Sequence, residues 1–374
     1  MMCAANLRKA SERTCAHLNQ RISLLNSDVL ESLGEIPRAS VDTVICDAPY
    51  GISITKNRRS ASNWDANSIA FSSEMWSEMR RVVKPGGILA AFGHPRTSHR
   101  QAVAIEDAGW QLFDTLAWVK SHGFQAGNRD VETEIRRHGD VGLAESFAGY
   151  GTHLAPAYEP ITLARNIGVR GSLIKNLRAG GAGALHIDAV RNSDDEWAWL
   201  AKRTTASISD NLSRTPGRVS PHAAWAVGGR SHSSSPHSGG RFPGNVILEH
   251  SALCTEDRCE PSCIAAELDG QGRRKYRQGK ERASRFFTRL RYSPRASASE
   301  RPNIDGVSAP TVKPQQLLEW LCALLVKPGA TVLDPFSGSG AIAEAALRAG
   351  AGHLIAIERE AAYAALIQDR LRRL

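Results

Sequence analysis

The stretch Val44-Ile45-Cys46-Asp47-Ala48-Pro49-Tyr50-Gly51 constrains the fold of this 374-residue chain most strongly. The apolar run that leads into it, from Val41 to Cys46, predicts a short buried strand. The strand is followed at once by an acid, a proline and an aromatic residue. In an open α/β sheet, ligands bind at the carboxyl ends of the strands. The sequence therefore predicts a binding site at this strand end.

Each of the four residues after the strand has a separate chemical use. The Asp47 carboxylate can accept a hydrogen bond from an amino group, and the backbone carbonyl of Ala48 can accept a second. Pro49 stiffens the turn, and Tyr50 offers a flat face on which a planar ring can stack. Together they suit the exocyclic amine of an aromatic base that has left its stack. The alternative interpretation is a strand followed by an ordinary proline turn.

A second stretch, near the other end of the chain, favours the binding-site interpretation over the ordinary turn. Thr331 to Gly340 reads Thr-Val-Leu-Asp-Pro-Phe-Ser-Gly-Ser-Gly, a predicted strand and a glycine-rich turn before a helix from Ala341 to Arg348. The next predicted strand, Leu354 to Ile357, ends in Glu358. The glycines allow close approach of a ligand, and the acid can bind ribose hydroxyls. The same glycines fit a dinucleotide fingerprint, so a nicotinamide-dependent oxidoreductase stays open on this stretch alone.

With both stretches, the chain resembles the amino-methyltransferases of DNA, which use S-adenosylmethionine. That family carries Asp/Asn/Ser-Pro-Pro-Tyr as its catalytic motif and Asp-Pro-Phe-x-Gly-Ser-Gly as its cofactor motif. The catalytic motif comes first here, which resembles the permuted β group of bacteria and phages. The resemblance covers most of the chain outside residues 200 to 240. Three alanines depart from the family pattern, namely Ala48 for proline, Ala155 for lysine and Ala309 for histidine.

The resemblance implies a Rossmann-like, doubly wound α/β sheet of the class I S-adenosylmethionine-dependent methyltransferases, permuted and interrupted by a target-recognition module. We expect an N-terminal extension at 1–20 and a catalytic half at 21–165. The target-recognition insertion would occupy 166–304, with 207–240 flexible because that stretch is rich in Ser, Gly, His and Pro. A cofactor-binding half would follow at 305–374. Alternating strands and helices favour a parallel sheet.

The resemblance also implies roles for individual residues. The expected catalytic residues are Asp47, Ala48, Pro49 and Tyr50. The expected cofactor-binding residues are Asp28, Thr311, Lys313, Asp334, Pro335, Phe336, Gly338, Gly340 and Glu358. Asp28 also suits the N-cap of a helix. The implied function is methylation of a flipped DNA base, with adenine N6 favoured because the motif starts with Asp. Cytosine N4, an RNA or protein amide substrate, and a non-catalytic DNA-binding relic are the alternatives.

The charge of the chain points to nucleic acid. The net charge is +9, and between Arg273 and Arg301 eleven basic residues meet only two acidic ones. Aromatic residues are interleaved with them, a pattern that suits contacts to phosphates and bases. The expected DNA-binding residues are Arg273, Arg274, Lys275, Arg277 and Lys280, and double-stranded DNA is the expected partner. A solvated charged loop is the alternative.

Three of the seven cysteines are clustered in His250-x3-Cys254-x4-Cys259-x3-Cys263. Three thiolates and one imidazole are an accepted tetrahedral zinc set. The surrounding module is rich in glycine and serine and can bury little core, so a structural zinc has a physical reason. Three unpaired thiols on a loop are the alternative.

The rest of the composition sets outer bounds. No apolar run approaches the roughly 18 residues of a membrane span, and residues 1–20 show no signal-peptide core, so we expect no membrane contact and a cytoplasmic location. A homodimer and a cognate restriction endonuclease, as in restriction-modification, are the further partners considered.

Overall fold

The backbone of the computed structural model is organised by one ten-stranded sheet. The structure describes residues 15–19, 21–52, 68–121, 130–154, 156–167, 173–192, 241–251, 253–255, 258–272, 283–290, 302–304, 306–309 and 311–374. The strand order in the sheet is β1-β2-β12-β11-β3-β4-β6-β5-β7-β8. The strands are β1 (Cys15–Asn19), β2 (Ile22–Leu25), β3 (Val41–Cys46), β4 (Val83–Phe92), β5 (Trp110–Val119), β6 (Tyr158–Asn166), β7 (Val246–Glu249), β8 (Thr288–Leu290), β11 (Thr331–Asp334) and β12 (His353–Ile357). A separate two-stranded ribbon pairs β9 (Asn303–Ile304) with β10 (Val307–Ser308).

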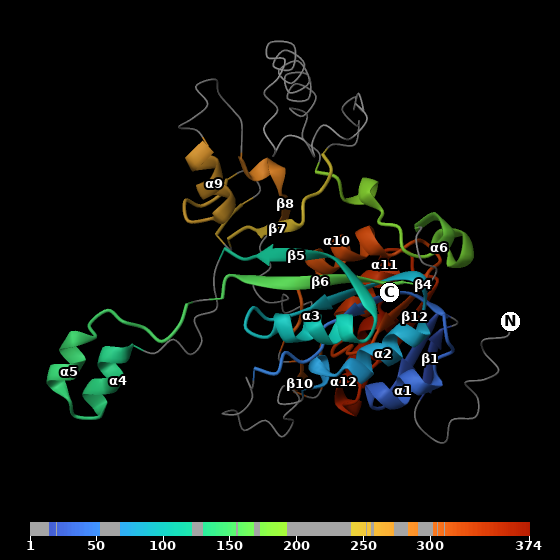
Figure 1. Cartoon of the computed structure of the whole chain (residues 1–374), viewed down its shortest axis with the longest axis horizontal. Coiled ribbons are helices and arrows are strands. Elements are labelled where there is room, and N and C mark those ends of the chain that lie inside the picture. The colour runs from blue at the N-terminus through green and yellow to red at the C-terminus, as the bar shows by residue number, and fades with distance from the viewer. Residues whose placement is uncertain are drawn as a thin grey trace, which may run out of the picture.

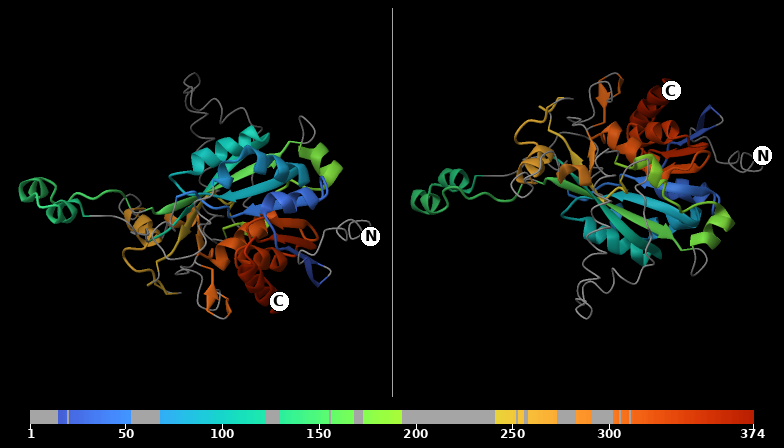
Figure 2. Two further views of the ribbon diagram at one scale, coloured as in Figure 1. Left: turned by 90° about the horizontal axis from the view of Figure 1, so that it is seen from below. Right: turned by 90° about the horizontal axis from the view of Figure 1, so that it is seen from above.

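Helices cover both faces of this sheet (Figures 1 and 2). One face carries α1 (Val29–Glu35), α2 (Ser73–Val82) and α3 (Ser98–Asp107), and the other carries α10 (Gln315–Leu325), α11 (Ala341–Arg348) and α12 (Ala361–Arg372). Shorter elements are η3 (Ile69–Phe71), α4 (Val131–Arg137), α5 (Val141–Ser146), α6 (Leu173–Gly180), η4 (Ile187–Val190), α9 (Ile264–Gly272) and η5 (Ala283–Phe286).

The strands show the alternation that a sheet buried on both faces requires. Along β3, Val44 and Cys46 pack with the α1–α3 layer, whereas Ile45 between them packs with the α10–α12 layer. Successive side chains of a strand point to opposite faces. Each apolar residue of the run from Val41 to Cys46 therefore has a core to enter, and the predicted doubly wound architecture is confirmed.

The sheet is dominated by parallel strands, as expected, but it is not wholly parallel. Strands β2, β12, β11, β3 and β4 run parallel to one another. Strand β6 lies antiparallel between β4 and β5, and β1 is antiparallel to β2 at the edge. Between β5 and β6, the helices in the described residues are α4 and α5, which project away from the sheet instead of packing on it as a crossover helix (Figure 1). Such a return places the next strand antiparallel to the last.

The expected insertion contributes two strands to the same sheet. Strand β7 pairs in parallel with β5, and β8 pairs in parallel with β7, so residues 246–249 and 288–290 extend the catalytic sheet at one edge. At the opposite edge, the last residues of the expected N-terminal extension form β1. Residues 193–240, which include the stretch expected to be flexible, lie outside the described residues.

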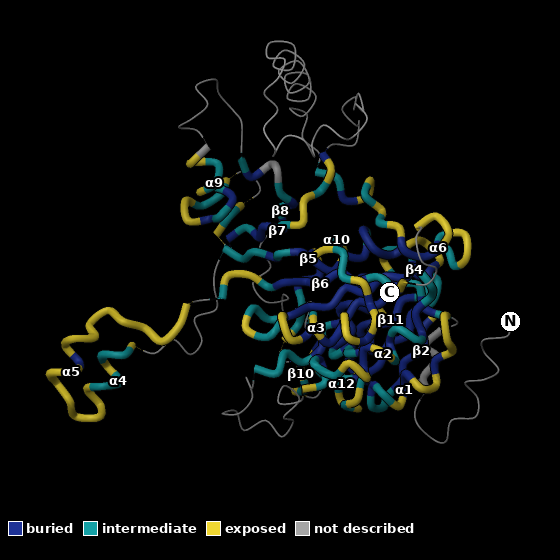
Figure 3. The backbone as a smooth tube through the Cα atoms, in the orientation of Figure 1, coloured by how far each residue is buried: buried dark blue, intermediate teal, exposed yellow. Residues whose placement is uncertain are grey.

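The α4–α5 pair differs from the rest of the fold. It projects away from the sheet (Figure 1), and most of its residues are exposed (Figure 3). Capping by Asp130 and Asp140, whose side chains accept hydrogen bonds from Glu132 N and Leu143 N, begins the two helices. No helix in the described part of the chain is long and apolar enough to cross a membrane.

Candidate active site

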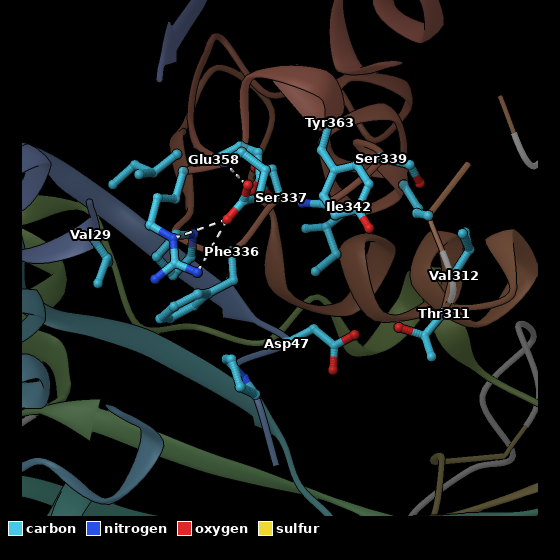
Figure 4. Close-up of a pocket in the computed structure, with 18 of the residues that line it drawn as sticks. Val29, Asp47, Thr311, Val312, Phe336, Ser337, Ser339, Ile342, Glu358 and Tyr363 are labelled. Carbon is cyan, nitrogen blue, oxygen red and sulfur yellow. Dashed lines mark hydrogen bonds and ion pairs between the residues drawn. The ribbon is translucent and has the colours of Figure 1, made fainter. Parts of the chain in front are cut away.

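Pairing of β3 with β11 brings the two sequence motifs to one end of the sheet. Val332 lies opposite Thr43 and Leu333 opposite Val44, so the turns that follow both strands open on the same pocket (Figure 4). The residues that line this pocket include Asp28, Asp47, Pro49, Thr311, Lys313, Pro335, Phe336, Gly338 and Glu358. One strand pair thus brings together residues that are 289 positions apart in the sequence.

The glycine-rich turn and Glu358 form one end of the pocket. Gly338 has a φ of +53°, and a Cβ placed on it would meet nothing within 4 Å, because that side of the turn faces the pocket. Its N–H donates to Glu358 Oε2 at 2.8 Å, and Glu360 N donates to Oε1 at 2.8 Å. These two amides fix the carboxylate. Burial raises the pKa of Glu358, although both amide hydrogen bonds oppose the shift.

Two of the expected cofactor residues act through the turn instead of lining the pocket. Asp334 is fully buried beneath it. Burial, assisted by the charges of Asp47 and Glu358, raises the pKa of Asp334 to about 8. Gly340 has a φ of +79° and lies at the N-cap of α11. A side chain there would press on Ile367 at 3.3 Å as well as strain the backbone.

Asp28, Thr311 and Ala48 have different positions relative to the pocket. The Asp28 side chain accepts a hydrogen bond from Leu30 N at 2.9 Å and caps α1, and it also lines the pocket. Thr311 lines the pocket from the loop that precedes α10. Ala48 has its side chain buried in the α1–α3 layer. An alanine there fills core space and leaves the backbone carbonyl as the polar group of that residue.

At the other end of the pocket, Asp47 is held in an ion pair. The Lys313 ammonium lies 2.8 Å from each carboxylate oxygen of Asp47 and 2.9 Å from the Tyr50 hydroxyl. Tyr50 donates to Asp47 Oδ1 at 3.0 Å or to Glu159 Oε2 at 3.1 Å. Lys313, expected at the cofactor, therefore directs its amine at the catalytic motif.

The network continues to a second ion pair. Glu159 in β6 contacts Lys120, which follows β5 directly, and lies 3.7 Å from Lys313. Burial alone would raise the pKa of Glu159, but Lys313 and Lys120 outweigh it and leave the pKa lowered. Burial alone would lower the pKa of Lys313, but Asp47 and Glu159 outweigh it and leave the pKa raised. Two carboxylates and two ammonium groups thus alternate in the order Asp47, Lys313, Glu159 and Lys120, and the first three of them surround the Tyr50 hydroxyl.

The same surroundings act on Tyr50. Burial, with the charges of Asp47 and Glu159, raises the pKa of its phenol well above the usual range. The Tyr50 carbonyl accepts a hydrogen bond from Thr97 Oγ1 at 2.9 Å, which fixes the turn. The Lys313 ammonium lies 5.1 Å from the ring centroid and the His94 ring 6.0 Å away. The ring is therefore a neutral, oriented surface.

Sequence reasoning missed Lys120 and pocket residues such as Ile69 and Tyr363. A signal for Lys120 existed, because it directly follows a predicted strand, as Asp47 does. Ile69 and Tyr363 carry no such mark, since their positions depend on how η3 and α12 pack.

The other expected sites have different outcomes. His250, Cys254, Cys259 and Cys263 are brought together, with all their ligand atoms within 4.8 Å of one another. The expected DNA-binding residues Arg273, Arg274, Lys275, Arg277 and Lys280 lie outside the described residues.

The parallel-dominated sheet therefore brings a glycine-rich turn, a fixed acid and the strand-end residues Asp47 and Pro49 to one pocket, with Tyr50 bound to Asp47 beside it. Residues 41–369 match the model of the N6/N4 methyltransferase family, described as DNA methylase. This match spans most of the chain, and the protein belongs to that family of methyltransferases.

Solved structures give similar matches at low identity. The complex of M1.HpyAVI with SAM is 15% identical, with 94% of this chain and 99% of that chain covered and a TM-score of 0.41. The PvuII DNA methyltransferase, described as cytosine-N4-specific, is 13% identical, with 93% and 85% covered and a TM-score of 0.47.

Proposed function

We propose that this enzyme transfers a methyl group from S-adenosylmethionine to the exocyclic amine of a base flipped out of double-stranded DNA, with adenine N6 as the favoured target. One observation carries the proposal. Asp47, which suits the amine, and Glu358, which suits a ribose, line one continuous pocket from two chain segments. In Figure 4, Phe336 lies between these two acids.

The chemistry of the lining fits the proposed cofactor. Two amides hold the Glu358 carboxylate in place, and each of its oxygens keeps a lone pair for a ribose hydroxyl. Phe336 offers an apolar surface, and Gly338 leaves its pocket side open. When bound, S-adenosylmethionine supplies an electrophilic methyl group and carries a positive sulfonium, which suits a pocket that four acids line, namely Asp28, Asp47, Glu358 and Glu360.

The residues of the chain orient the acceptor. The Asp47 carboxylate and the Ala48 carbonyl would accept the two amine hydrogens and direct the nitrogen lone pair toward the methyl group. Tyr50 would stack on the base, a contact worth roughly 1–3 kcal/mol. Fixed acceptors and dipoles of this kind accelerate a reaction by positioning and electrostatics. Lys313, which now neutralises Asp47, would share that carboxylate with the incoming amine.

Adenine is favoured over cytosine because family members whose motif begins with Asp are more often adenine enzymes. The substrate experiment is direct. The full chain is incubated with methyl-labelled S-adenosylmethionine and DNA of mixed sequence, and the DNA is digested to nucleosides. We expect label in N6-methyladenosine. Label in N4-methylcytosine would overturn the adenine assignment and keep the reaction, whereas no label with bound DNA would support the non-catalytic alternative.

The cofactor assignment has its own test. Glu358→Gln should weaken S-adenosylmethionine binding about tenfold, since a lost hydrogen bond to a charged group costs roughly 1.5 kcal/mol. Calorimetry measures the affinity, and Glu319→Gln on the exposed side of α10, outside the pocket, is the matched control. An unchanged affinity in Glu358→Gln would remove the ribose role.

A further inference from the structure

One cluster of side chains lies outside the active site and is not used by the proposed reaction. It joins His250, directly after β7, with Cys254 and Cys259 in the following loop and Cys263, directly before α9. His250 Nδ1 lies 3.4 Å from Cys259 Sγ and 3.5 Å from Cys263 Sγ. With zinc bonds of about 2.3 Å to sulfur and about 2.0–2.1 Å to nitrogen, a tetrahedron places nitrogen and sulfur ligands roughly 3.5 Å apart.

We propose that His250, Cys254, Cys259 and Cys263 bind one structural zinc ion. The four side chains complete a tetrahedral coordination shell, so no position is left for water or substrate, which is the mark of a structural site. Asp47 follows β3, separated in the sheet from β7 by β4, β6 and β5. The proposed ion thus takes no part in methyl transfer.

Packing alone does not explain why these thiols converge. Cys263 is fully buried, but Cys254 and Cys259 are only half-buried. Leu253 beside them is 72% exposed, so the loop contributes little apolar surface to a core. Three thiols also cannot all be satisfied by one disulfide. A cation that binds all three explains the convergence, and soft thiolate ligands favour zinc.

Hydrogen bonds of the main chain hold together the loop that carries these cysteines. Thr255 N donates to Arg258 O at 2.9 Å, and Arg258 N donates to Thr255 Oγ1 at 3.2 Å. Thr255 directly follows Cys254 and Arg258 directly precedes Cys259, so these contacts hold the two cysteines near each other. His250 N in turn donates to Leu290 O at 2.9 Å, which continues the pairing of β7 with β8.

A serine after β5 links the cluster to the catalytic sheet. Ser121 Oγ donates to Glu249 O at 2.6 Å and accepts from Ile264 N at 3.5 Å. Glu249 directly precedes the first ligand, and Ile264 directly follows the last. The ion and this serine would therefore fasten the end of β7 and the start of α9 at the same place.

The proposed zinc site would also affect residues 273–282, the basic segment that contains the expected DNA-binding residues. Asp269 in α9 accepts hydrogen bonds from Ser284 N at 2.8 Å and Ser284 Oγ at 3.0 Å. This contact holds α9 and η5 together on either side of residues 273–282. The zinc would thus set where both ends of that segment leave the fold. This effect on DNA rests on the proposed function, whereas binding of the metal does not.

The primary test is the metal content of the purified full chain, for which we expect about one zinc per chain. Cys254→Ser and Cys259→Ser should each lose most of the metal. Cys322→Ala, which removes a buried thiol from α10, should retain it. Replacement by cobalt should give the intense thiolate-to-metal absorption of a tetrahedral site in the parent and in Cys322→Ala, and a weakened band in the two ligand variants.

Two outcomes would overturn the site. One is a folded, reduced, zinc-free parent whose three thiols titrate freely and that gives no cobalt spectrum. The other is zinc retained in both ligand variants. A separate measurement of ligand affinities tests the link to DNA independently of the metal site. The zinc-free variants should keep their S-adenosylmethionine affinity and lose most of their affinity for DNA. Zinc loss with unchanged DNA affinity would leave the metal site in place and overturn its link to DNA.

Discussion

Two regions of the single sheet are stabilised in different ways. One is the carboxyl end of the central strands β3 and β4, which we call the catalytic end, and the other is the edge formed by β7 and β8, which we call the far end. At the catalytic end, β3 and β4 bury side chains on both faces against two layers of helices. At the far end, among the described side chains between residues 241 and 290, the large apolar ones that are buried are Ile247, Leu248 and Leu290. There, hydrogen bonds donated by Ser121 and accepted by Asp269 connect the strands and helices, and the Cys/His cluster lies beside them. The catalytic end thus has a packed apolar core that holds charged groups in place. The far end has little apolar core and relies on polar contacts to hold its strands.

The largest effect on stability should come from the charges buried at the catalytic end. Lys313→Met leaves Asp47 and Glu159 without their shared cation, and breaking such a buried pair costs about 3–5 kcal/mol. Denaturant unfolding measures the loss. Asp47→Asn in the same chain should recover part of it. The matched control is Arg136→Met, which removes the exposed pair with Glu132 on α4 and should change stability by about 0.5 kcal/mol or less.

Asp47→Asn alone tests the chemistry of that end. It removes one acceptor for the amine and keeps the shape of the site, so turnover should fall about 10²–10³-fold. Binding of S-adenosylmethionine, measured by calorimetry, should change little because the proposed role of Asp47 is to bind the amine of the base. Turnover within about tenfold of the parent would contradict the assigned role.

Asp334, at the catalytic end, should make the free energy of unfolding depend on pH. The raised pKa of about 8 means that the folded chain holds a proton that the unfolded chain releases near its ordinary pKa. The stabilisation is therefore complete at low pH and is lost as the pH rises toward 8, by at most about 1.4 kcal/mol per pH unit. Unfolding of Asp334→Asn at pH 5, 6, 7 and 8, without cofactor, should lack this decline. Parallel curves for the two proteins would contradict the burial argument.

The smallest effect should come from the far end. Replacing Arg273, Arg274 and Lys275 by glutamine should weaken DNA binding and flatten its salt dependence by about one unit of slope per lost phosphate contact. Replacing Arg136 and Arg137 on α4 is the control of similar charge. If both sets changed the slope equally, the basic segment would have no special place, and the contrast between the two ends would lose its functional meaning.

Contiguous motifs explain what could be predicted from the sequence. Asp47, Phe336, Gly338 and Glu358 each lie in or directly after a strand whose apolar run is readable, so their meeting at one sheet edge follows from the fold class. The Lys120–Glu159–Lys313 chain could not be predicted in this way. It needs β6 to lie antiparallel beside β5, and strand order is a property of packing that periodicity does not contain.

The far end was predictable in composition but not in placement. The Cys/His spacing indicated a cluster of ligands. The local sequence did not indicate that β7 and β8 would join the catalytic sheet, or that Ser121 would form hydrogen bonds to residues beside the cluster.

The strand order also has a consequence for how the protein is made. Strand β2, near the start of the chain, pairs with β12, and β3 pairs with β11. A ribosome therefore completes both early strands long before it synthesises their neighbours. Contacts so distant in sequence slow folding, and unpaired strand edges invite aggregation. Until β11 and β12 emerge, β2 and β3 have open edges, so the nascent chain should depend on chaperones for longer than a methyltransferase whose cofactor strands come first.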